Sequence, residues 1–128
     1  MLQGDFFNIH NLEKADFEIK ADLVINAGHK IFEGHFPGHP VVPGVCMMEM
    51  VKEIMEEVIG KKTNLISAGE MKFLAIINPE ENTDIQAALK YKIEETGNIT
   101  VSATLFKNER TYFKFKGIFD LQGLLHNL

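Results

Sequence analysis

The chain has 128 residues, of which 45% are hydrophobic and 24% are charged, a composition typical of one globular domain. Its 13 basic and 18 acidic side chains give a net charge of −5, which argues against nucleic acid as a partner, because nucleic-acid binding needs a basic surface. The single Cys46 excludes an internal disulfide. The sequence shows neither a signal-peptide pattern nor an apolar run near the roughly 18 residues of a membrane span. We therefore expect a cytoplasmic protein with a single domain over residues 1–128.

The first predicted strand follows a weakly patterned start. Phe6 to His10 fit either a short strand or a turn of helix. From residue 16 to residue 26 apolar and polar side chains alternate, as they do in a strand with one buried face. The apolar positions of this strand are Phe17, Ile19, Ala21, Leu23 and Ile25.

A loop rich in proline and glycine follows this strand. Residues 34–44 contain three of the four prolines of the chain, so this stretch can be neither a helix nor a central strand. Two histidines, His35 and His39, lie within it. A stiff loop that presents an imidazole is a good candidate for chemistry, because imidazole titrates near neutral pH.

The pattern then becomes helical from Val45 to Ile59, and Gly60 is a natural stop. Most of the circumference of this helix is apolar, which predicts that a sheet wraps around it. Cys46 and the methionines are expected to fill the core. The polar side is expected to carry Glu49, Lys52, Glu53, Glu56 and Glu57.

The rest of the chain is typical of an antiparallel meander. Strands are predicted at residues 65–77, 85–93, 99–105 and 111–119, with a hairpin turn at residues 95–98. The tail from residue 122 to residue 128 is expected to fray. The predicted fold class is α+β, with one long central helix inside a curved antiparallel sheet. The first and last strands would be open edges, so we expect a homodimer that covers an edge.

The loop and the helix start together resemble a known family. The stretch from His35 to Val45 contains a His-Phe-Pro-Gly loop and a Pro-Gly-Val step into the helix, and Glu49 lies fourteen positions after His35. This pattern resembles the active-site segment of the hotdog-fold beta-hydroxyacyl-(acyl carrier protein) dehydratases. The resemblance covers most of the chain after residue 30.

The resemblance implies a hotdog fold and a substrate tunnel at a dimer interface, with histidine and acid contributed by different subunits. It implies His35 and Glu49 as the catalytic pair and the Gly44 backbone N–H as the donor to the thioester carbonyl. Phe36 and Val45 are expected to contact the substrate. Acyl carrier protein is the implied partner, and the assembly would be a homodimer or a trimer of dimers. No cofactor and no metal are expected.

The same roles follow from the chemistry of dehydration. Elimination of water needs a base for the alpha proton and an acid for the hydroxyl group that leaves. An imidazole with a pKa of about 6.5 suits the base, here His35. A carboxyl group in an apolar pocket can keep its proton and donate it, as we predict for Glu49. An N–H at the first turn of a helix, such as that of Gly44, can stabilise the developing negative charge on oxygen.

The sequence departs from the family at Glu53, where members commonly carry Gln. A second carboxylate one turn from Glu49 could raise the pKa of Glu49 or disturb its hydrogen bonds. Because a carrier protein is acidic, it would need a basic patch, and the sequence does not rank the candidates for it, which are Lys61, Lys62, Lys72, Arg110, Lys114 and Lys116.

Two alternatives stay open on the sequence alone. One keeps the fold and changes the reaction to hydrolysis of an acyl thioester. The other is a dimer that binds acyl carrier protein without catalysis, with Glu53 marking a degenerate site. The remaining histidines (His10, His29, His39 and His126) have no predicted role.

Overall fold

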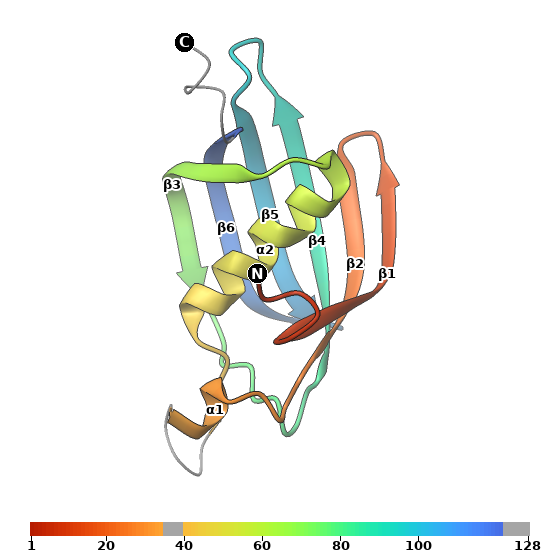
Figure 1. The fold of residues 1–128 in the computed structure, drawn as a ribbon, viewed down its shortest axis with the longest axis vertical. Coiled ribbons are helices and arrows are strands. Elements are labelled where there is room, and N and C mark those ends of the chain that lie inside the picture. Colours follow the sequence, from red (N-terminus) through yellow and green to blue (C-terminus); the bar gives the residue numbers. More distant parts are fainter. Residues whose placement is uncertain (35–39, 122–128) are drawn as a thin grey trace.

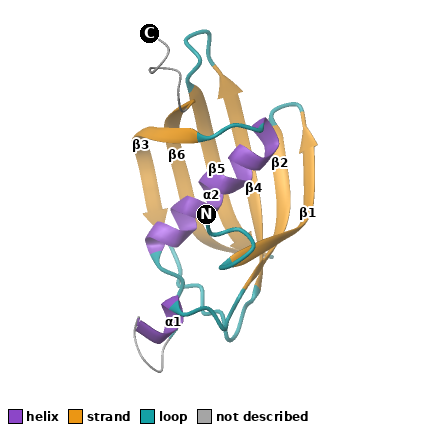
Figure 2. Cartoon of the chain, viewed as in Figure 1, coloured by secondary structure: helices purple, strands orange, loops and turns teal. Residues whose placement is uncertain are grey.

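The protein is an antiparallel sheet curved around one long helix, as a computed structural model describes for residues 1–34 and 40–121. Figure 1 shows the helix α2 crossing one face of the sheet, and Figure 2 shows the division into strands and helices. The α+β class predicted from the sequence is confirmed. The elements in chain order are β1 (Phe7–Ala15), β2 (Glu18–Ile25), α1 (Ile31–Gly34), α2 (Gly44–Ile59), β3 (Thr63–Phe73), β4 (Asp84–Ile93), β5 (Ile99–Lys107) and β6 (Arg110–Leu121).

The six strands lie in the order β1-β2-β4-β5-β6-β3, with every neighbouring pair antiparallel. The last strand of the chain, β6, was expected at an edge but lies between β5 and β3. The edges are β1 and β3 instead, because the chain crosses the sheet through α2 before it enters β3. The open edge next to the start of α2 is therefore that of β3 (Figure 1).

The N-terminal hairpin corrects two expectations. Residues 7–15 form a full strand, β1, where the sequence showed only weak patterning. Phe17 was expected in the buried row of the following strand, but it lies in the turn between β1 and β2 with a φ of 67° and a side chain that is 55% exposed. Its ring meets that of Tyr91 edge to face, at 5.4 Å between centroids. The buried row of β2 starts at Ile19.

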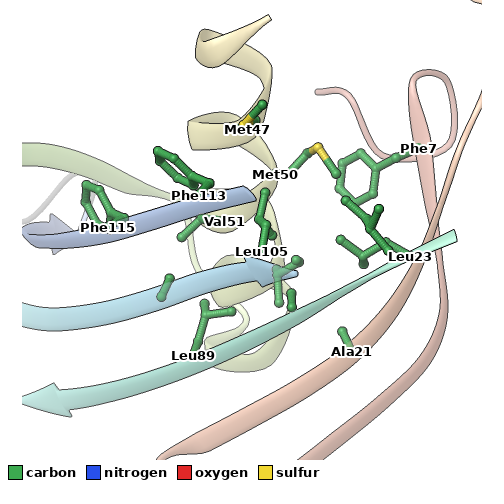
Figure 3. Packing of buried hydrophobic residues seen from close by; sticks show 14 of the residues in the cluster. Phe7, Ala21, Leu23, Met47, Met50, Val51, Leu89, Leu105, Phe113 and Phe115 are labelled. Carbon is green, nitrogen blue, oxygen red and sulfur yellow. The ribbon is translucent and has the colours of Figure 1, made fainter. Parts of the chain in front are cut away.

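Helix α2 is placed by its two ends and its apolar surface. It begins after Pro43, whose extended backbone cannot continue a helix backwards, and it ends at Gly60 in the left-handed conformation at a φ of 72°. Its apolar side packs on the inward side chains of the sheet, as Figure 3 shows for Met50 and Val51 near Leu105. No helix of the described residues is long and apolar enough to cross a membrane.

Two members of the predicted polar side of α2 are buried. Glu53 is 2% exposed and Glu56 is 7% exposed. The backbone N–H groups of Leu2 and Gln3 donate to Glu53. The backbone N–H and the side-chain hydroxyl of Thr63 both donate to Glu56. Partners from other parts of the chain thus satisfy both carboxylates, whereas Glu57 stays exposed as expected.

Candidate functional site

An apolar groove of about 390 Å³ lies at the start of α2. One wall is Gly44 and Met47 on the first turns of the helix. The other is the end of β3 and the segment after it, with Phe73, Leu74 and Ile76. The Val42 N–H donates to the Ile77 carbonyl at 2.9 Å and ties the two walls together at one end. Gly44 lies on the lining of this groove.

Gly44 is the first residue of α2. Pro43 before it is extended at φ −62° and ψ 147°, and its carbonyl accepts the N–H groups of Cys46 and Met47. The first N–H groups of a helix have no acceptor within the helix, and the positive end of the helix dipole lies there. An oxygen that carries partial negative charge is stabilised at such a position. The structure therefore gives Gly44 the backbone position that the predicted role requires.

Glu49 lies in the second turn of α2, partly buried on the side of the helix that faces away from the sheet. Burial raises the pKa of its carboxyl group above the usual value, and the neighbouring Glu53 raises it further. Lys52 opposes this rise, and Glu56 adds to it. A raised pKa makes a carboxyl group better suited to act as a general acid, which is the chemistry predicted for Glu49.

The other predicted site residues divide into two groups. Val45 is 78% exposed and lies four positions before Glu49, so the two side chains share one face of α2. His35 and Phe36 lie outside the described residues. The structure therefore places Gly44, Val45 and Glu49 within the first six residues of one helix, and it does not describe the histidine expected to act with them.

The sequence did not identify Phe73 as a site residue. Its ring lies against Gly44, at 2.8 Å from where a Cβ on that residue would stand, and it stacks on Phe113 at 4.9 Å between centroids. No local pattern in the sequence signals this, because the two residues come from separate elements. Phe73 therefore lines the groove directly beside the first residue of α2.

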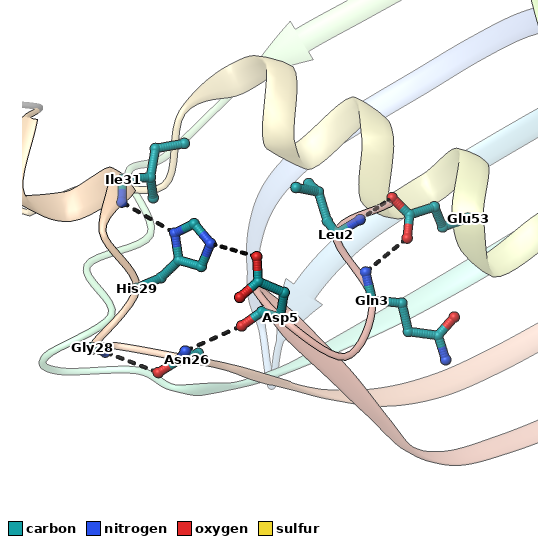
Figure 4. Close-up of polar contacts among 8 residues, drawn as sticks. All are labelled: Leu2, Gln3, Asp5, Asn26, Gly28, His29, Ile31 and Glu53. Carbon is teal, nitrogen blue, oxygen red and sulfur yellow. Dashed lines mark hydrogen bonds and ion pairs between the residues drawn. The ribbon is translucent and has the colours of Figure 1, made fainter.

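His29 was predicted to have no partner, and the structure corrects this. Its Nδ1 accepts the Ile31 N–H at 3.1 Å, so Nε2 carries the ring proton of the neutral form and faces the Asp5 carboxylate at 3.0 Å (Figure 4). This arrangement fixes the entry to α1. Within residues 1–34 and 40–121 there is no group of three or more histidine, cysteine, aspartate or glutamate side chains placed to hold a metal ion.

A larger hollow, of about 510 Å³, lies on the face of the sheet turned away from α2. Its lining includes Lys90, Lys92 and Lys116 beside the small side chains of Thr100 and Ser102. It lacks a residue of the candidate site, so we assign the chemistry to the groove at the start of α2. Of these lysines, Lys90 pairs with Glu18 at 3.5 Å and Lys92 with Glu94 at 3.8 Å.

Comparison with known proteins identifies related sequences. The model of the ApeI-like family, described as ApeI dehydratase, matches residues 10–113. A 3-hydroxyacyl-(acyl-carrier-protein) dehydratase FabZ from Blochmanniella pennsylvanica is 28% identical over 108 residues, which are 84% of this chain and 66% of that protein. The family match over residues 10–113 begins before the Pro/Gly loop and ends in β6, so it includes every described residue of the candidate site.

Two solved structures show the same fold. The dehydratase heterocomplex ApeI:P from Xenorhabdus doucetiae aligns with a TM-score of 0.65 at 22% identity, over 88% of this chain and 96% of that one. A putative thioesterase from a Silicibacter species aligns with a TM-score of 0.61 at 16% identity, over 94% of this chain and 81% of that one. The hotdog fold expected from the sequence is confirmed, and at these identities the two structures bear on the fold alone.

Proposed function

The chain belongs to the ApeI-like dehydratase family, and on this premise we propose that it removes water from a beta-hydroxyacyl thioester carried on acyl carrier protein. The product is the trans-2-enoyl thioester, as an intermediate of fatty acid or related lipid or polyene biosynthesis. The observation that carries the proposal is the family match over residues 10–113, in which the helix start at Gly44 and Glu49, whose pKa is raised, lie within two turns.

In the proposed reaction His35 takes the alpha proton of the substrate and Glu49 gives a proton to the hydroxyl group, which leaves as water. The negative charge that develops on the thioester oxygen is stabilised by the Gly44 N–H. Two features support these roles. Burial and Glu53 raise the pKa of Glu49, which favours its protonated form, and an apolar groove lies beside Gly44.

We further propose that a second hotdog chain completes the site, in a homodimer or a trimer of dimers. The edge strand β3 and the segment after it carry a row of exposed apolar side chains, and an open edge with such a row is a ready surface for pairing. The row consists of Leu65, Ile66, Met71, Phe73, Leu74 and Ile76. The exposed face of Val45 and Glu49 lies beside it, so the same partner would cover the acid.

Lysines on β3 and β6 support docking of an acidic carrier protein. Of the candidate lysines, Lys72 and Lys114 are direct cross-strand neighbours on β3 and β6, and Lys116 faces Glu70 in the same ladder. The ion pair with Lys72 lowers the pKa of Glu70, and the charges of Lys116 and Lys114 lower it further. We propose Lys114 and Lys116 as carrier contacts, because they lie together on one face.

The test is the enoyl-thioester absorbance produced by the purified protein from a beta-hydroxyacyl carrier substrate. We expect turnover in the wild type and its loss in both His35→Ala and Glu49→Gln; full activity in both variants would refute the assignment. Release of free thiol without enoyl product would identify a thioesterase instead. Carrier binding without turnover at several chain lengths would identify a non-catalytic carrier-binding dimer. Native mass spectrometry distinguishes two identical chains from a mixed pair, as in the Xenorhabdus doucetiae heterocomplex.

A further inference from the structure

Glu53 joins two parts of the chain that are 50 residues apart. Its Oε2 accepts the Leu2 N–H at 2.7 Å and its Oε1 accepts the Gln3 N–H at 2.8 Å (Figure 4). The side chain is 2% exposed. Two short hydrogen bonds from the backbone leave this carboxylate a single orientation, because the amides to which it is bound cannot rotate as a side-chain donor can.

The N-terminal turn that supplies these amides is itself anchored. Within the turn the Phe6 N–H donates to the Leu2 carbonyl at 2.7 Å, and the Phe6 ring is fully buried against Phe32. At its far end the Asp5 carbonyl accepts the Asn26 side-chain amide at 3.1 Å, and the Asp5 carboxylate lies 3.0 Å from His29. The turn is therefore a fixed support and not a loose end that happens to lie near α2.

The charges around Glu49 show why this support matters. The titratable groups that shift the pKa of Glu49 in the described chain all belong to α2: Glu53, Lys52 and Glu56. The hollow beside Glu53 is also lined by Met1 of the turn and by Lys61 and Lys62 after the helix, and Asp5 of the turn pairs with His29. Lys52, the one cation on the helix here, is bound to Glu56 at 3.3 Å.

In the ranges 1–34 and 40–121 no lysine, arginine or histidine forms an ion pair with Glu53. Glu53 raises the pKa of Glu49 across one turn of the helix, by a hydrogen bond between the two side chains and by its charge. The two backbone N–H groups donate to Glu53 and not to Glu49, so they hold the Glu53 carboxylate in place beside Glu49.

We propose that Glu53 is a positioning residue: the backbone of the N-terminal turn fixes its carboxylate one helical turn from Glu49, and this fixed charge favours the proton-donating form of Glu49. The catalytic meaning of that proton rests on the proposed dehydratase function. The electrostatic link between the two carboxyl groups and the turn does not, so the two can be tested separately.

The first experiment titrates Glu49 directly, by NMR of the full chain labelled with carbon-13 at the glutamate carboxyl groups, with Glu49→Gln to assign the signal. In Glu53→Gln we expect the titration midpoint of Glu49 to fall by about one pH unit, because a negative charge one turn away is lost. Glu57→Gln is the matched control on the exposed side of the same helix and leaves the midpoint unchanged. An unchanged midpoint in Glu53→Gln overturns the proposal.

A second pair of variants leaves Glu53 in place and tests the turn. Gln3→Pro removes the N–H that donates to Glu53 Oε1, whereas Gln3→Ala keeps it. We expect the Glu49 midpoint to fall in Gln3→Pro and to stay at the wild-type value in Gln3→Ala, with thermal melting to show that both variants are folded. Equal midpoints in the two folded variants overturn the role of the turn.

The activity measurement separates this inference from the proposed function. If both hold, the alkaline limb of the pH–rate profile for enoyl formation moves to lower pH in Glu53→Gln by the same amount as the Glu49 midpoint. A wild type without turnover refutes the dehydratase, while a shift of the NMR midpoint still supports the link between Glu53 and Glu49. A moved midpoint with an unmoved rate profile overturns the positioning role.

Discussion

The ring of Phe73 lies against the first residue of α2, Gly44. A Cβ on Gly44 would stand 2.8 Å from Cε1 and 2.9 Å from Cζ of that ring, closer than such atoms approach in proteins. Phe73 is 51% exposed and stacked on Phe113, so the ring can move outward but not inward. Glycine at this position therefore keeps the helix N–H accessible beneath an aromatic cover.

The first prediction concerns Gly44→Ala. The new methyl group pushes the Phe73 ring outward and occupies the space beside the N–H, so we expect kcat/KM for enoyl formation to fall by about 10²-fold, the lower end of losing one donor to a developing oxyanion. The ring is half exposed, so the free energy of unfolding should change by less than about 1 kcal/mol. Phe73→Ala with Gly44 retained is the control that separates loss of the cover from the added methyl. Wild-type kcat/KM in Gly44→Ala contradicts the role of this N–H.

The second prediction concerns Glu49→Gln and the pH dependence of stability. Because burial and Glu53 raise the pKa of Glu49 in the folded protein, the folded state holds this proton to higher pH than the unfolded state. Stability from this group is then full below the unfolded pKa and is lost as pH rises through the folded pKa. Glutamine has no charge to bury, so the variant should gain stability relative to the wild type at pH 7 and not at pH 4.

Urea denaturation at the two pH values measures this difference in stability. The activity of the variant should fall although its stability at pH 7 rises. Loss of a general acid lowers kcat by about 10²- to 10⁴-fold. A variant that is more stable at pH 7 yet inactive would show that the Glu49 carboxyl group is needed for activity although its burial lowers the stability of the fold. A variant that is less stable at pH 7 contradicts the raised pKa.

The central helix and the later strands could be predicted from local pattern alone. The apolar periodicity placed the helix at residues 45–59, against Gly44–Ile59 in the structure, and the strand at residues 85–93, against Asp84–Ile93. These elements have regular burial, so the polarity of each side chain indicates whether it lies on the buried or the exposed side of its element. The same regularity predicted that the sheet wraps the helix.

Features that depend on distant partners could not be predicted in this way. The strand β1 is an edge strand with few buried side chains, so it has no strong alternation to detect. Glu53 and Glu56 look like members of a solvated stripe until Leu2, Gln3 and Thr63 are seen to cover them. Within the site, the spacing of Glu49 from the loop could be found only through family resemblance, and the contact of Phe73 with Gly44 only in three dimensions.

The third prediction concerns the buried carboxylate of Glu56. Its Oε2 accepts the Thr63 N–H at 2.6 Å and the Thr63 hydroxyl at 3.1 Å, which holds the end of α2 to the start of β3. Glu56→Ala removes the acceptor of both hydrogen bonds, and we expect a loss of about 1–3 kcal/mol in the free energy of unfolding. Glu57→Ala, an exposed neighbour, should change it by less than about 0.5 kcal/mol. Equal values for the two variants in urea denaturation would count against this anchor.

The fourth prediction concerns packing between β3 and β6. A Cβ on Gly117 would stand 2.7 Å from the backbone oxygen of Ser67 and would also meet the buried ring of Phe115, so neither neighbour can yield freely. We expect Gly117→Ala to lose about 1–3 kcal/mol, as overpacked sites do. Gly69, on the paired strand, has its nearest such contact at 3.9 Å, so Gly69→Ala should be tolerated. Thermal melting of the two variants compares them directly.

The last prediction concerns the open edge of β3. Ile66 lies on this strand at a register shift against β6 and is 51% exposed, and Ile93 at the end of β4 has the same exposure. If a second chain covers the β3 edge, a lysine at Ile66 brings an unpaired charge into the interface, whereas a lysine at Ile93 stays in water. We expect Ile66→Lys to weaken self-association by about tenfold or more, since an uncompensated buried charge costs more than 1.4 kcal/mol. Sedimentation velocity over a concentration series measures this, and Ile93→Lys should sediment as the wild type does.

Loss of turnover in Ile66→Lys together with the loss of self-association, in a variant that remains folded, would tie the activity to the covered edge. Equal self-association of the two variants would place the interface elsewhere.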